Sequence, residues 1–206
     1  MTGSRPLLIG YGPSVYTRAV RMAAAHHWIS YDWQAHDPFE EPVAAHPFGR
    51  VPVWQDGSAT IYETAAILTY LEAQAGTFVR DPVTAARVQQ VAGIVDAYAY
   101  WPLVRQVYAH AVFRPLQGET GDPAQIDAGL AAAPNILAAL EALALEGHVL
   151  TGSVVTRADW HLAPMIAAFV AYPPAMALLA EHPALLRWFD TIRQSPAFQM
   201  TEETPT

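Results

Sequence analysis

A serine stands where the first helix of the chain is expected to begin. Ser14 follows the turn-forming pair Gly12-Pro13 and precedes apolar residues at helical spacing. A serine in this position usually caps the helix by accepting a backbone N–H. The same helix end favours an anion, so a hydroxyl there could also donate to a bound thiolate and lower the thiol pKa from about 8.5.

A proline marks the start of a later predicted strand. The segment PFGRVPV, residues 47–53, places Pro52 between two valines. Such a proline is often an ordinary feature of an edge strand. Alternatively, the Val51–Pro52 bond is cis and turns the backbone N–H and C=O of Val51 toward a cleft. An extended peptide ligand could then pair with that backbone as an added strand.

An acid and a hydroxyl open the helix that follows the next hairpin. Glu63 and Thr64 could simply cap this helix in its first turn. They also suit the recognition of a zwitterion, because Glu63 can accept from an ammonium group while the hydroxyl and N–H of Thr64 hold a carboxylate. The residues alone leave both interpretations open.

A capping box stands late in the chain, before an apolar helix. In TRADW, residues 156–160, Thr156 has the spacing of an N-cap and Asp159 the spacing of the acid that reaches back to it. We interpret this pair as structural.

The elements that must position these residues fall into two regions. Strands are expected at 6–10, 28–33, 51–54 and 59–62, the last two joined at Asp56-Gly57, and helices at 15–27 and 63–75. An irregular acidic stretch at 37–41 could supply one helical turn, which gives the order β-α-β-α-β-β-α with a mixed sheet. Beyond residue 82 only helices are expected: 83–113 with a kink at Pro102, then 124–146, then shorter ones from 157, 175 and 183. The boundaries are therefore 1–78, 83–200 and a disordered tail at 201–206.

The composition excludes several kinds of function. The chain has 206 residues, 52% of them hydrophobic, and a formal charge of −8. An acidic chain is not expected to bind nucleic acid or an anionic membrane. The absence of cysteine excludes disulfides, thiolate metal sites and an enzyme thiol. The histidines form no metal motif, and Pro173-Pro174 interrupts the apolar run 162–180, so we expect a cytoplasmic protein with neither a metal nor a membrane span.

Taken in order, these motifs resemble the glutathione transferase superfamily. The resemblance covers roughly residues 6–198 and rests on SVYTRAV at 14–20, PFGRVPV at 47–53, Asp56-Gly57, YETAAI at 62–67 and TRADW at 156–160. The serine-type members, phi and theta-like, are the most similar. The resemblance implies a thioredoxin-like N-terminal domain packed on an all-helical C-terminal domain, usually as a homodimer.

The resemblance also implies roles in binding glutathione. Ser14 would donate to the thiolate, Val51 ahead of a cis Pro52 would pair with the cysteinyl backbone, and Glu63 and Thr64 would hold the γ-glutamyl ammonium and carboxylate. Asp159 would serve folding. Because some classes of the family use a tyrosine in place of the serine, Tyr11 and Tyr16 are rival hydroxyls; we rank both lower, because Tyr11 precedes the turn and Tyr16 lies inside the helix.

The glycine end of glutathione lacks its usual partners. Serine-type members carry basic residues before the segment equivalent to PFGRVPV, whereas residues 37–41 here are acidic. That leaves His36, His46 or Arg50 for the glycine carboxylate.

A second substrate would lie between the domains. Aromatic residues on the long helix share one face at helical spacing, and a cation lies in the same stripe. A stripe of this kind often packs in the core of a protein, but the cation within it favours a position facing a cleft. With Tyr11 from the first domain, the candidate pocket residues are Tyr98, Trp101, Arg105 and Tyr108.

We therefore expect a transferase that conjugates glutathione to small hydrophobic electrophiles. Two alternatives stay open. One is a non-catalytic member of the fold that binds a ligand or partner, which the acidic segment 37–41 favours. The other is a glutathione-dependent isomerase or dehalogenase.

Overall fold

The computed structural model describes residues 5–202, which divide into two units. The first unit holds the described residues up to Phe78 together with 195–202, and the second runs from Val79 to Gln194. The expected tail at 201–206 lies partly outside the described residues.

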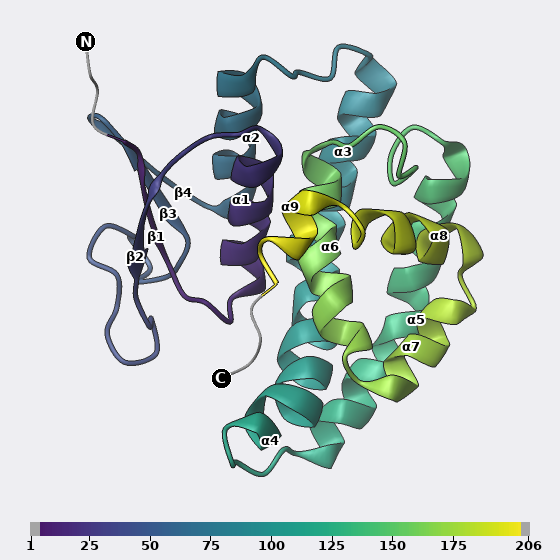
Figure 1. Ribbon diagram of the computed structural model, residues 1–206. Coiled ribbons are helices and arrows are strands. Elements are labelled where there is room, and N and C mark those ends of the chain that lie inside the picture. The colour runs from purple at the N-terminus through teal and green to yellow at the C-terminus, as the bar shows by residue number, and fades with distance from the viewer. Residues whose placement is uncertain (1–4, 203–206) are drawn as a thin grey trace. The chain divides into compact units, whose positions relative to one another are not determined.

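A mixed four-stranded sheet forms the centre of the first unit (Figure 1). Its strands are β1 (Leu7–Gly10), β2 (Asp32–Ala35), β3 (Val53–Asp56) and β4 (Ala59–Tyr62), in the order β2-β1-β3-β4. β1 pairs in parallel with β2 and antiparallel with β3, which pairs antiparallel with β4. The parallel pair needs a crossover, which α1 (Val15–His26) provides.

Helices α1 and α2 (Thr64–Ala75) cover one face of this sheet (Figure 1). Leu8 and Trp54 of the sheet and Met22, Ile67 and Leu71 of the helices are fully buried. Burial of a large apolar side chain stabilises the fold by about 1.5–3 kcal/mol.

The acidic segment between β2 and β3 contains turns and no regular helix. The Glu41 N–H donates to the Asp37 carbonyl at 3.1 Å, which makes a single helical turn. The prolines at positions 38, 42, 47 and 52 explain why it does not extend. Each removes a backbone donor and disfavours helical backbone in the residue before it.

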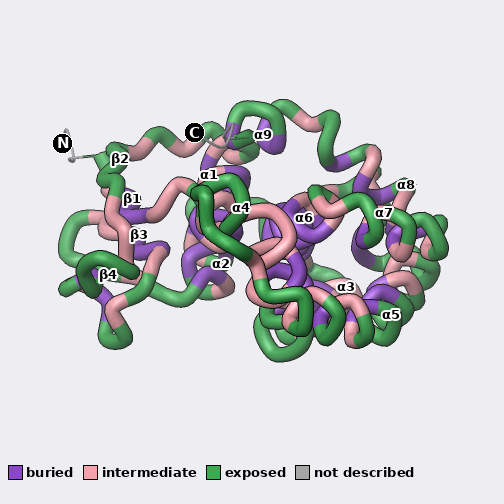
Figure 2. The backbone as a smooth tube through the Cα atoms, turned by 90° about the horizontal axis from the view of Figure 1, so that it is seen from below, coloured by how far each residue is buried: buried purple, intermediate pink, exposed green. Residues whose placement is uncertain are grey.

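Within its described residues, the regular elements of the second unit are all helices. It contains α3 (Pro82–Ile94), η1 (Val95–Phe113), α4 (Arg114–Leu116), α5 (Pro123–Glu146), α6 (Arg157–Val170), α7 (Pro173–Ala180) and α8 (Pro183–Ile192). The run 162–180 is split, as predicted, because Pro173-Pro174 starts a new helix. Helix α6 is buried on nearly all sides and forms the centre of this unit (Figure 2).

The long helix differs from the expected kinked α-helix. Residues 95–113 of η1 are wound as a π-helix, with wider i→i+5 turns, and Pro102 lies inside this segment. Its buried residues are Val95, Ala99, Leu103, Val104 and Val107. Four of them recur every fourth residue, and Val104 directly follows Leu103. None of the aromatic residues of the expected stripe is among them.

The C-terminal segment packs with the first unit, although the sequence placed it in the second up to residue 200. In α9 (Pro196–Gln199), the Phe198 ring lies 4.2 Å from the Arg18 guanidinium, which also donates to the Phe198 carbonyl at 3.3 Å. Thr201 is buried and donates to the Ala197 carbonyl at 2.9 Å. Thr201 is therefore an ordered residue, and residues 203–206 lie outside the described part of the chain.

Gly129 of α5 lies directly against η1, and we expect Gly129→Ala to destabilise the protein. A Cβ at this position would lie 2.6 Å from the Pro102 carbonyl oxygen, a backbone atom that cannot turn away. Overpacking of this kind costs about 1–3 kcal/mol, which urea denaturation would measure.

Gly93 of α3 provides the matched control, because a Cβ there meets nothing within 4 Å. Gly93→Ala should stabilise the protein by up to about 1 kcal/mol, since alanine is the better helix former. Equal effects of the two substitutions would contradict the packing assigned to Gly129.

Candidate functional site

One row of paired residues brings the candidate glutathione residues to the same end of the sheet. Ile9 of β1 pairs with Val53 of β3, and Val53 pairs with Tyr62 of β4. Just beyond this row, β1 leads to Ser14, the Val51–Pro52 bond leads into β3, and β4 leads to Glu63. Because neighbouring strands lie about 4.8 Å apart, the row spans roughly 10 Å.

Ser14 is the N-cap of α1, as its sequence position predicts. Its Oγ accepts the Thr17 N–H at 3.2 Å, and its own N–H donates to the Tyr11 carbonyl at 3.0 Å. The side chain is only partly buried. Accepting one hydrogen bond uses a lone pair and leaves the hydroxyl proton for an acceptor such as a thiolate.

The two tyrosines near Ser14 are differently placed. Burial and the hydrogen-bonded carboxylate of Asp37 raise the pKa of Tyr11, with a further contribution from Glu40. The Tyr11 hydroxyl is therefore hydrogen-bonded to the Asp37 carboxylate and keeps its proton. Tyr16 lies within α1, between the buried residues Val15 and Thr17.

The Val51–Pro52 peptide bond is cis, as the resemblance implies. Pro52 is buried, and Val51 packs against the small core of Ile9, Val43 and Val53. This packing fixes the backbone that leads into β3 beside the end of β1.

Glu63 precedes α2 in an unusual backbone conformation. Its φ is 67° and its ψ is 120°, a region that L-residues rarely occupy, and its side chain makes no capping hydrogen bond. The carboxylate is instead 65% exposed. Thr64, the first residue of α2, is buried, and its N–H belongs to the first turn, where backbone donors have no partner within the helix. The simple capping interpretation therefore does not hold for the Glu63 side chain.

His46 lies beside Glu63. Its side chain is 4% exposed, Nδ1 accepts the Phe48 N–H at 3.1 Å, and Nε2 lies 4.0 Å from Oε1 of Glu63. Burial lowers the pKa of His46, the Glu63 carboxylate raises it, and Arg50 lowers it.

The three candidates for binding the glycine carboxylate have different surroundings. Nε2 of His36 lies 2.6 Å from the Glu41 carbonyl, and His46 faces Glu63. Arg50 is exposed.

The candidate residues for the second substrate lie in different units. Tyr11 belongs to the first unit, whereas Tyr98, Trp101, Arg105 and Tyr108 lie on η1 in the second. Tyr98 and Trp101 are exposed, and Arg105 and Tyr108 are partly buried. The pocket stays a prediction.

The predicted capping box is present and has an additional member. Asp159 is fully buried; its Oδ2 accepts the Thr156 N–H at 2.7 Å and the Thr156 hydroxyl at 2.9 Å. Its Oδ1 accepts the Trp188 indole N–H at 2.7 Å. Burial raises the pKa of Asp159, and the hydrogen bonds oppose that shift. The box therefore ties the start of α6 to α8.

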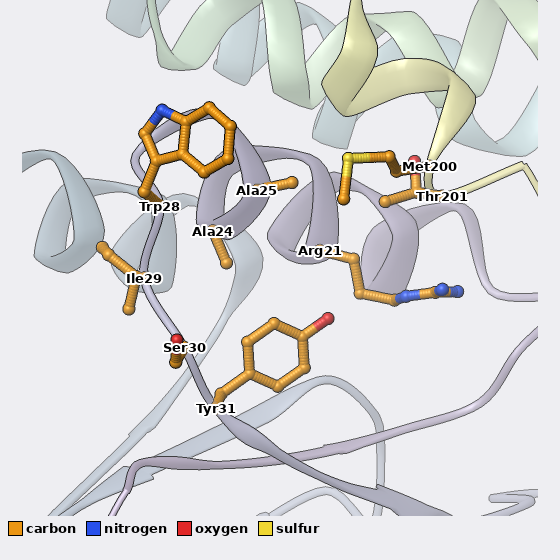
Figure 3. Close-up of a pocket in the computed structure, with 9 residues that line it drawn as sticks. All are labelled: Arg21, Ala24, Ala25, Trp28, Ile29, Ser30, Tyr31, Met200 and Thr201. Atoms are coloured by element: carbon orange, nitrogen blue, oxygen red, sulfur yellow. The ribbon is translucent and has the colours of Figure 1, made fainter.

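A shallow hollow of about 250 Å³ opens elsewhere on the first unit (Figure 3). Trp28, Tyr31 and Met200 line it together with Arg21. Trp28 follows α1 with φ 56° and is 86% exposed. None of the candidate glutathione residues lines this hollow.

Within residues 5–202, no three histidine, cysteine or acidic residues are grouped as metal ligands would be. Helix α5 alone among the described helices has the length and apolar composition of a membrane span.

Comparison with known proteins identifies the family. Residues 13–74 match the family model for the glutathione S-transferase N-terminal domain, and residues 123–191 match the C-terminal domain. Glutathione S-transferase F13 of Arabidopsis thaliana is 30% identical over 162 residues, or 76% of this chain and 73% of that protein. Glutathione S-transferase 3 of Zea mays is 28% identical over 77% of this chain and 73% of its own length. The chain is therefore an enzyme of the glutathione S-transferase family.

Solved structures confirm the fold. Glutathione S-transferase III in its apo form aligns with a TM-score of 0.82 at 22% identity, covering 96% of this chain and 95% of that one. Glutathione S-transferase I, bound with lactoylglutathione, aligns with a TM-score of 0.84 at 21% identity, covering 96% and 98%. The predicted thioredoxin-like N-terminal domain and helical C-terminal domain are thus confirmed. The matched C-terminal domain begins at α5, so this apolar helix belongs to it.

Several partners of the site residues were not found from the sequence. Asp37 lies far from Tyr11 in the chain, Glu63 from His46, and Trp188 from Asp159. No local spacing rule relates these pairs. Only the register of the strands and the packing of the helices bring them together.

We expect Glu63→Gly to stabilise the protein, because glycine adopts positive φ without strain. A strained residue of this kind costs about 1–3 kcal/mol, so the gain should be at the lower end of that range once glycine's greater unfolded-state entropy is subtracted. Thermal or urea denaturation would measure it. Glu63→Gln keeps the strain and should leave stability nearly unchanged, so equal stabilities of the two variants would contradict a strained backbone here.

We expect Asp159→Ala to destabilise the protein by about 3 kcal/mol or more, because it leaves the buried donors of Thr156 and Trp188 without their acceptor. Thr156→Ser keeps the hydroxyl and is the control, with an expected loss below about 1 kcal/mol. Denaturation curves would compare the two. A loss for Asp159→Ala no greater than that of the control would show that the box contributes little to stability.

Proposed function

We propose that this enzyme conjugates the thiolate of glutathione to small hydrophobic electrophiles, with Ser14 as the residue that activates the thiol. The Ser14 hydroxyl donates to the sulfur at the N-terminus of α1, where the helix dipole also favours negative charge. Both effects lower the thiol pKa, so more thiolate is present at neutral pH. The thiolate then forms a carbon–sulfur bond with the electrophile, and a leaving group departs or a proton is taken up.

The register of the sheet is the observation that carries this proposal. The row Ile9–Val53–Tyr62 gathers Ser14, Val51 and Glu63 at one end of the first unit. An extended tripeptide matches this spacing, because its residues rise about 3.3 Å each. Val51 would pair with the cysteinyl backbone, and Glu63 and Thr64 would hold the ammonium and carboxylate of the γ-glutamyl group. A related structure bound with lactoylglutathione supports a glutathione-type ligand.

The remaining contacts belong to the same proposal. Arg50 is the better placed cation for the glycine carboxylate, because the available nitrogen of His46 faces Glu63. Tyr11, Tyr98, Trp101, Arg105 and Tyr108 would line the site of the electrophile. We further propose a cytoplasmic homodimer, as in the resemblance from which these roles come.

A non-catalytic binding protein is the second candidate. The acidic segment 37–41 favours it, since Asp37 and Glu40 act on Tyr11 near the proposed site and oppose an anionic ligand. A glutathione-dependent isomerase or dehalogenase would use the same activated thiolate and differ only in the electrophile.

Removal of the Ser14 hydroxyl tests the proposal. In Ser14→Ala and in Ser14→Gly, we expect the pKa of bound glutathione to return toward about 8.5, the ordinary value of a thiol. Each unit of that rise lowers the thiolate fraction, and hence the rate near pH 6.5, about tenfold. Ultraviolet titration of the thiolate and the pH dependence of conjugation of a model aromatic halide would measure both effects.

The two variants separate catalysis from helix capping. Alanine at an N-cap costs about 1 kcal/mol of stability, whereas glycine costs only a few tenths. Equal thiol pKa values in two variants of unequal stability would assign the effect to the hydroxyl. An unchanged thiol pKa in both would rule Ser14 out, and failure of the wild type to bind millimolar glutathione would favour the non-catalytic candidate.

A further inference from the structure

His46 is held so that one ring nitrogen faces the proposed ammonium-binding carboxylate. Because Nδ1 accepts the Phe48 N–H at 3.1 Å, the neutral ring carries its proton on Nε2. That nitrogen lies 4.0 Å from Oε1 of Glu63. The ring is fixed by its burial and by the Tyr62 and Phe48 rings, whose centroids lie 5.0 and 6.0 Å away.

The charged groups acting on His46 are Glu63 and Arg50. Burial is the largest influence and lowers the pKa of His46, Arg50 acts in the same direction, and Glu63 opposes both. His46 therefore titrates below the ordinary histidine value of about 6.5. It is therefore neutral at physiological pH and becomes a cation only below its lowered pKa.

We propose that His46 is a positioning residue for glutathione recognition: neutral His46 leaves the Glu63 carboxylate to the γ-glutamyl ammonium, and protonated His46 competes for it. The inference rests on the proposed role of Glu63. Two cations, the imidazolium and the ammonium, would then share a single carboxylate. Each disfavours the other, so proton binding and ligand binding are negatively coupled.

The direction of the pH dependence follows from this coupling. Above about pH 6.5 His46 is neutral and affinity is at its highest. Below the pKa of His46 in the free enzyme, affinity falls by up to about tenfold for each pH unit. Bound ligand lowers the pKa of His46 further, because the ligand ammonium pairs with the Glu63 carboxylate, which otherwise raises that pKa.

The test compares S-methylglutathione binding in the wild type and in His46→Asn. The S-methyl group removes the titrating thiol, so neither the ammonium nor the carboxylates of the ligand change charge between about pH 5.5 and 7.5. Asparagine suits position 46 because its Oδ1 can accept the Phe48 N–H two residues on, in an Asx turn. Calorimetric titrations at these two pH values give the change in affinity for S-methylglutathione with pH in each protein.

We expect the affinity of His46→Asn to change less than about twofold between about pH 7.5 and 5.5, and that of the wild type to fall by more than this. If both proteins bind and their affinities change equally with pH, the inference is overturned and the proposed function stands. No binding of S-methylglutathione by the wild type at pH 7.5 would overturn both.

A ligand-free measurement checks the coupling itself. The His46 ring titration, followed by NMR, should move to lower pH in Glu63→Gln, because the carboxylate that raises the pKa of His46 is removed. An unshifted titration would show that Glu63 does not act on His46 and would overturn the inference even if wild-type binding depended on pH.

Discussion

The proposed site depends on one constraint, the alignment of three strands at the row Ile9–Val53–Tyr62. A slip of one residue in β3 or β4 would turn every side chain to the opposite face. The same slip would carry Val51 or Glu63 away from the N-terminus of α1. Close packing at Gly10 fixes the end of β1, since a Cβ there would collide with Thr17 and lie 2.9 Å from the Trp33 ring.

The polar groups at this end of the sheet come mostly from helix termini. Ser14 caps α1 and Thr64 begins α2, so each lies where backbone N–H groups have no acceptor within the helix. Such ends attract anions without any lysine, which the chain lacks entirely. Two carboxylates also lie among the site residues: Asp37 beside Tyr11, and Glu63 beside His46. This balance of donors and acids suits a zwitterionic ligand better than a simple anion.

The helical unit is organised by a different set of interactions. Gly129 permits α5 to approach the wide turns of η1, and Asp159 links the start of α6 to Trp188 of α8. In the π-wound η1, Ala99 and Leu103 are buried, whereas Tyr98 and Trp101 are exposed. Any surface that this helix presents to a substrate is therefore set by its backbone as much as by its sequence.

The sequence by itself determined which region holds the strands and which holds only helices, the order of the motifs, the cap at Ser14 and the box at Thr156–Asp159, because each depends on neighbours within a few residues. Tertiary structure decided the rest. The π-winding of η1 is a backbone feature that the spacing of its residues did not predict. The packing of 195–202 with the first unit and the partners of Tyr11 and Asp159 join residues far apart in the chain. The contact of His46 with Glu63 is of the same kind, since only strand register brings the turn before β3 to the helix after β4. Local spacing carries no information about such contacts, which packing and register alone specify.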